Sequence, residues 1–157
     1  MKLSEVQANI KSLIATQAAL SSSLLENISV WYEGELEAGQ EIDIDKKIAT
    51  GVASNGFAIA IFEPDIMTID ETANKGIGFA YFTAAVDVAL FTSPRRNRNG
   101  GLDRNPLEIV EEINTALFAK PNTNFQNGYR PSADPFYKGE SEFALVYNMN
   151  FNIKVTF

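Results

Sequence analysis

The C-terminal stretch "FALVYNMNFNIKVTF", residues 143–157, carries the strongest structural signal in the sequence. Its apolar residues occupy every second position, with polar residues between them. The apolar set is Phe143, Leu145, Tyr147, Met149, Phe151, Ile153, Val155 and Phe157. At about 3.3 Å per residue, a strand of this length would span on the order of 50 Å. The alternation predicts one long antiparallel strand with a polar, half-exposed face and an apolar face against helices.

Two further apolar stretches predict the other core strands. "GFAIAIFEPD", 56–65, indicates a buried strand that ends at Pro64, because proline cannot donate a ladder hydrogen bond. "GIGFAYFTAAVDVALFTSP", 76–94, is longer than a typical strand, and its apolar residues change face along its length. We therefore expect one long strand with a bulge near Ala84 and Ala85.

Helical spacing of apolar residues predicts a helix over residues 3–26, and the β-branched and aromatic "NISVWYEGELE" after it predicts a strand. "NPLEIVEEINTALF" predicts a helix at 106–118, with Asn105 as its cap and Pro106 in the first helical position. Its expected buried stripe is Leu107, Val110, Ile113, Ala116 and Leu117, with Glu111 and Glu112 outside.

The order of these elements predicts a single α+β domain over residues 1–157. We expect two layers: a mostly antiparallel sheet with a long C-terminal strand, packed by the N-terminal helix and the helix at 106–118. Residues 121–140 are turn-rich, with at most a short strand near 124–129. Asp87 alternates with Val86 and Val88, so we expect it on the solvated face of its strand rather than in a catalytic site.

Composition narrows the function classes. The chain has no histidine and no cysteine, which excludes Ser-His-Asp and Cys-His catalysis, the usual zinc sites and disulfides. Its formal net charge of −7 argues against a broad nucleic-acid-binding face. No apolar run approaches the roughly 20 residues that span a bilayer, and the amphipathic start does not match a secretory signal.

An acidic stretch follows the first predicted strand, with no basic residue before Lys46. Its acids are Glu33, Glu35, Glu37, Glu41, Asp43 and Asp45. The alternation in "EIDIDKKIA" predicts an exposed edge strand or ribbon, and "TGVASNG" after it predicts a turn. Asp43 and Asp45 raise the question of calcium, but the glycine and bidentate glutamate of an EF-hand loop are missing, so we expect no metal.

Four arginines lie in the loop "TSPRRNRNGGLDRNP", 92–106: Arg95, Arg96, Arg98 and Arg104. The loop leads into a helix N-terminus, where an anion would be favoured, but it matches no phosphate-binding pattern. A solvated loop and a protein interface, where arginine is enriched, are the other interpretations. The loop has no interleaved aromatics for base stacking, so nucleic acid is not an expected partner.

Four aromatic residues allow two interpretations. Trp31, Tyr32, Phe136 and Tyr137 could line a sugar or peptide groove, although scattered aromatics more often pack in a core or an interface.

The order of elements resembles that of the tail-terminator, or tail-completion, proteins of long-tailed bacteriophages. The residues that carry the resemblance are "LSEVQANIKSLIATQ", "ISVWYEG", "GFAIAIFE", "GFAYFTAAVDVALFTSP", "NPLEIVEEINTALF" and "FALVYNMNFNIKVTF". The resemblance implies a non-enzymatic virion protein without a cofactor, assembled in the bacterial host cytoplasm. Such proteins form a ring, commonly a hexamer, that ends the tail tube and offers a surface to the head–tail connector.

Under this resemblance, the arginines of the 92–106 loop would face the acidic stretch of a neighbouring subunit, or the tail tube, because a closed ring needs two unlike patches. The alternative is a small ligand-binding module or a carboxylate-dependent hydrolase, with a pocket between the helix at 106–118 and the sheet.

Overall fold

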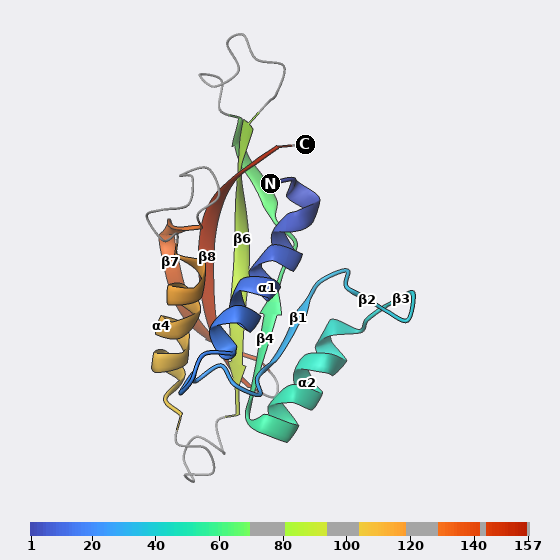
Figure 1. Ribbon diagram of the computed structural model, residues 1–157, viewed down its shortest axis with the longest axis vertical. Coiled ribbons are helices and arrows are strands. Elements are labelled where there is room, and N and C mark those ends of the chain that lie inside the picture. Colours follow the sequence, from blue (N-terminus) through green and yellow to red (C-terminus); the bar gives the residue numbers. More distant parts are fainter. Residues whose placement is uncertain (70–80, 94–103, 119–128, 142–143, 157) are drawn as a thin grey trace.

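The computed structural model describes residues 1–69, 81–93, 104–118, 129–141 and 144–156. It confirms the α+β class, with helices packed on a mostly antiparallel sheet (Figure 1). Within these residues the main sheet has the order β1-β4-β6-β8-β7, and β5 pairs with β6 beside this path. The elements are η1 Leu3–Glu5, α1 Val6–Ala18, β1 Ser29–Tyr32, β2 Leu36–Glu37, β3 Gln40–Glu41, α2 Ile44–Asn55, β4 Phe57–Ile61, β5 Asp65–Ile69, β6 Tyr81–Thr92, α4 Pro106–Leu117, β7 Arg130–Glu140 and β8 Leu145–Thr156.

The centre of the sheet is the antiparallel pair of β6 and β8. Their register runs without a shift from Tyr81 opposite Thr156 to Thr92 opposite Leu145. The bulge expected near Ala84 and Ala85 is therefore absent from this pair. The only irregularity along β6 is on the side of β5, between Ile66 and Thr68.

The alternation in β8 is confirmed. Its buried apolar residues are Tyr147, Met149, Phe151, Ile153 and Val155, while Asn148 is buried on the other face; Phe143 and Phe157 lie outside the described residues. The apolar face meets the buried side chains of α1 and α4, which are Val6, Ile10, Ile14, Ile109, Val110, Ile113 and Leu117. On the opposite face, Asp87 accepts a hydrogen bond from Asn150 Nδ2 at 2.6 Å. Asp87 thus lies on the face away from α1 and α4, as expected.

Residues 44–55 form the helix α2, so the ribbon and turn expected here are wrong. The Asp43 carboxylate caps the helix by accepting a hydrogen bond from Lys46 N at 3.2 Å, and Gly56, with φ 82°, ends it. Ile48 and Val52 are one turn apart and pack on Ala58 and Ala60 of β4, on the face opposite to α1 and α4. The alternation at 41–45 does not indicate a strand, because these residues are the end of β3, the segment that leads to α2 and the first two residues of that helix.

Three smaller expectations also need correction. The N-terminal helix ends at Ala18, well before residue 26. Strand β7 occupies much of the segment expected to be turn-rich, because a strand at the sheet edge tolerates proline. In α4, Leu107 is 50% exposed and Ile109 is buried instead.

Gly51 sets the distance between α2 and the sheet. A Cβ added at this position would lie 3.0 Å from Ala58 Cβ and 3.5 Å from the carbonyl oxygen of Phe57. The helix therefore rests on the backbone of β4, and a larger side chain would have to push the two elements apart.

We expect Gly51→Leu to lower the free energy of unfolding by about 1–3 kcal/mol, because the added side chain overpacks this contact. Ala53→Leu is the matched control, since Ala53 is exposed on the same helix. It should change stability by no more than about 0.5 kcal/mol. Urea unfolding followed by circular dichroism measures both, and equal stabilities of the two variants would contradict the close packing.

Tyr129 ties the start of β7 to the N-terminal helix. Its hydroxyl is buried and donates a hydrogen bond to Asn9 Oδ1 at 2.8 Å. Burial raises the pKa of this hydroxyl well above its ordinary value.

This pKa shift predicts loss of stability in base. The unfolded chain releases the Tyr129 proton near its ordinary pKa of about 10, and the folded chain holds it to higher pH. The contribution of Tyr129 is therefore complete below about pH 10 and falls as the pH rises further. Tyr129→Phe should flatten the fall in unfolding free energy above about pH 10. Tyr137→Phe, a change at an exposed tyrosine, should not.

Candidate functional site

A small hairpin projects from one side of the molecule (Figure 1). We call residues 33–43 the arm; its strands β2 and β3 pair only with each other among the described residues. The turn between them has Ala38 at φ 52° and Gly39 at φ 80°, as a two-residue hairpin turn requires. Every residue from Leu36 to Glu41 is exposed, including the Leu36 side chain at 65%. The arm thus lies outside the hydrophobic core.

Trp31 in β1 and two lysines hold the base of the arm. The amines of Lys11 from α1 and Lys47 from α2 lie 4.8 Å and 4.5 Å from the centre of the Trp31 ring. Lys11 also pairs with Glu35, and Lys47 pairs with Glu37 at 2.6 Å. Two of the predicted interface acids therefore bind lysines of their own chain.

Glu33 also has intramolecular contacts. Its backbone N–H donates to the Ile61 carbonyl at 2.9 Å, and its carboxylate accepts from Glu63 N at 3.1 Å. Gln7 Nε2 donates to the Glu33 carbonyl at 3.0 Å. These bonds join the start of the arm to the end of β4.

Glu41 and Asp45 are the acids left for outside contacts. Both are exposed, and neither forms an ion pair with a described residue. Asp45 lies in the first turn of α2, where negative charge is favourable, and Asp43 caps that helix. Within the described ranges, no group of three or more acids lies together to hold a metal ion.

The predicted arginine cluster divides into two parts. Arg95, Arg96 and Arg98 lie outside the described residues. Arg104 turns inward on its own chain: Nη1 donates to the carbonyl oxygens of Leu24 at 3.0 Å and Glu26 at 2.7 Å. The structure thus gives Arg104 a contact within its own chain, which sequence reasoning missed.

Glu112 holds the same connection from the other side. Its carboxylate accepts hydrogen bonds from Ser23 Oγ at 2.6 Å and from Leu24 N at 2.7 Å. Glu112, which was expected outside the buried stripe, is half-buried by these contacts. Arg104 and Glu112 together fix the chain between α1 and β1 against α4.

The other end of the sheet is strand β7. We call residues 130–141 the β7 edge; it lies at the opposite end of the strand order from β1 (Figure 1). Phe136 is 44% exposed and Tyr137 is 60% exposed. The sequence-based prediction included these two aromatics but not Lys138. If residues 136–138 had been expected to form a strand, Phe136 and Lys138 would have been expected on the same face, because they are two residues apart.

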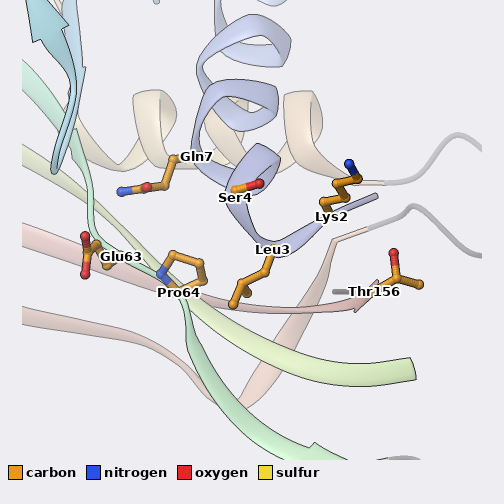
Figure 2. A pocket seen from close by; sticks show the side chains of 7 residues that line it. All are labelled: Lys2, Leu3, Ser4, Gln7, Glu63, Pro64 and Thr156. Atoms are coloured by element: carbon orange, nitrogen blue, oxygen red, sulfur yellow. The ribbon is translucent and has the colours of Figure 1, made fainter. Parts of the chain in front are cut away.

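An open pocket of about 380 Å³ lies where the chain termini meet (Figure 2). Its lining is Lys2, Leu3, Ser4, Gln7, Glu63, Pro64 and Thr156. In Figure 2, Glu63 and Gln7 lie at one end of the pocket, and Lys2 and Thr156 lie at the other. Glu63 is the single carboxylate among the described lining residues. Among the described lining residues, no second carboxylate converges with Glu63 to make the pair that a hydrolase would use.

The interface between α4 and the sheet, where the alternative function expected a pocket, holds packed apolar side chains. Ile109, Ile113 and Leu117 are each at most 2% exposed. They belong to one cluster with β4, β6 and β8 residues.

No protein-family model matches the chain, and no curated protein matches it in sequence. In the described part of the chain, no helix has the length and apolar character to cross a membrane.

Arg104→Ala should lower the free energy of unfolding by about 1–3 kcal/mol, because the partly buried carbonyl oxygen of Leu24 and the exposed one of Glu26 both lose their donor. Arg130→Ala removes the same charge at an exposed position of β7 and should leave stability nearly unchanged. Thermal or urea unfolding of both variants is the measurement. Equal stabilities would show that the inward contact of Arg104 contributes nothing.

Proposed function

We propose that this protein is a structural, non-enzymatic subunit that assembles with copies of itself into a closed ring. By its resemblance, the ring ends a phage tail tube, stops tube polymerisation and joins the tail to the head. Its partners are then other copies of the chain, the tube protein and the head–tail connector. Its location is the virion, after assembly in the host cytoplasm.

One observation carries this proposal: the two ends of the sheet present unlike exposed surfaces. At one end the arm projects with exposed acids and Leu36; at the other the β7 edge exposes Phe136 and Tyr137. A ring needs a contact in which one surface of a subunit meets a different surface of the next. Surfaces at opposite ends of one sheet can form such a contact repeatedly.

The arm itself also favours assembly. An isolated two-stranded hairpin is marginally stable in water, and this one exposes the large apolar side chain of Leu36 while Ile42 is half-buried. The lysine pairs at its base orient the arm without covering it. Burial against a second subunit would supply the apolar contact that the arm lacks.

Two observations count against the alternative, a ligand-binding module or a hydrolase. Packed side chains fill the interface between α4 and the sheet, and the acid and the amine of the terminal pocket lie at opposite ends (Figure 2).

Arg95, Arg96 and Arg98 keep their proposed role as contacts to the neighbour or to the tube.

We expect the purified protein to form, with increasing concentration or on added tail tubes, one closed species whose mass is a whole multiple of the monomer mass. Because opposite charges set the register, assembly should weaken as salt rises from about 0.05 to 0.5 M. Multi-angle light scattering measures the mass, and electron microscopy of tubes grown with the protein measures their length. A monomer under all these conditions, with tubes of unchanged length, would contradict the proposal.

A further inference from the structure

The two faces of the arm differ in what they can contact. In the hairpin, Leu36 is opposite Glu41 and Glu37 is opposite Gln40. Directly paired residues lie on the same face, so Leu36 and Glu41 share one face, and Glu37 and Gln40 share the other. Glu37 is bound by Lys47 of its own subunit. The face with Leu36 and Glu41 is therefore the one left for an outside partner.

The β7 edge carries a matching pair. Phe136 and Lys138 are two residues apart, and they lie opposite Met149 and Tyr147 of β8, so their side chains share a face. The Phe136 ring stacks on the Tyr147 ring at a centroid distance of 6.1 Å. Lys138 Nζ lies 5.5 Å from the centre of the same ring. Tyr147 thus holds an exposed aromatic ring and an exposed amine side by side.

We infer that Leu36 and Glu41 of one copy of the chain dock on Phe136 and Lys138 of the next copy. This inference rests on the proposed function and specifies the contact within the ring. Leu36 would cover the Phe136 ring, and the Glu41 carboxylate would pair with the Lys138 amine. The spacing agrees, because paired residues of a hairpin are about 5 Å apart, residues two apart on a strand are about 7 Å apart, and both charged side chains are long.

The composition of β7 favours this side-chain contact over the addition of a strand. Pro131 and Pro135 have no backbone N–H, and prolines on an edge strand disfavour pairing with a further strand. Charge then sets the partner and the register, while the apolar contact supplies attraction.

Charge exchange between two separately purified variants tests the contact. In Glu41→Lys the arm would meet Lys138 of its neighbour, and in Lys138→Glu the edge would meet Glu41, so each variant alone should assemble less readily than the wild type. For each variant alone, the protein concentration at half assembly should be at least about tenfold higher than for the wild type. In an equimolar mixture every contact between unlike variants pairs opposite charges, so a ring with an even number of subunits should form again.

The controls keep the result interpretable. Both positions are exposed, so circular dichroism should show folded variants. Asp65→Lys makes the same charge change at an exposed residue outside both surfaces and should assemble like the wild type. The double variant Glu41→Lys with Lys138→Glu should assemble on its own. Leu36→Ser should also raise the concentration for half assembly, by about tenfold.

The outcomes separate the contact from the ring itself. If the wild type assembles and both single variants assemble equally well, the contact is wrong and the ring stands. The contact is also wrong if neither the mixture nor the double variant restores assembly. A wild type that never assembles, with or without tail tubes, overturns both the contact and the proposed function.

Discussion

The pairing of β6 with β8 is the constraint on which the rest of the structure depends. Twelve residues of each strand pair in one uninterrupted register. Because neither strand shifts, one face of this ribbon stays apolar along its length, and it can be covered only by the apolar faces of α1 and α4. The opposite face carries the asparagines of β8 and Asp87, so it does not compete for those helices.

The central pair also makes the two ends of the sheet unlike. On one side, the short strands β4 and β1 follow, and the chain then turns outward into the arm. Lysines from α1 and α2 converge on Trp31 there and fix the base of the arm by ion pairs. On the other side, β7 ends the sheet with exposed aromatic side chains and prolines in its sequence. Unlike ends are what a repeating head-to-tail contact requires.

Local sequence patterns predicted the parts of the fold that local physics decides. The period of two in β8 and the Asn105-Pro106 start of α4 are both found in the structure, because burial of one face and helix capping depend on nearby residues. The start of α2 had similar signals in Asp43 and Gly56, but the alternation of charges before it hid the four-residue spacing of Ile44, Ile48 and Val52. The prolines of β7 led to the prediction of turns rather than a strand, although an edge strand tolerates proline.

The candidate site was harder to predict because its residues meet only in the folded chain. Nothing in the sequence shows that Arg104 binds carbonyl oxygens at Leu24 and Glu26, about half the chain away. The sequence of the acidic stretch likewise does not show which of its acids bind lysines of the same chain. In the structure, Glu41 and Asp45 form no ion pair with a described residue, Glu41 lies opposite Leu36, and Lys138 lies two residues from Phe136 at the other end of the sheet.

Amide hydrogen exchange of the monomeric and assembled protein tests the central claim, that the arm of one copy binds the β7 edge of the next. The account predicts fast exchange of residues 36–41 in the monomer, because all of them are exposed, and slowed exchange on assembly. The β7 edge should be protected in the same step. An arm that exchanges equally fast in the monomer and in the assembled state would contradict the account.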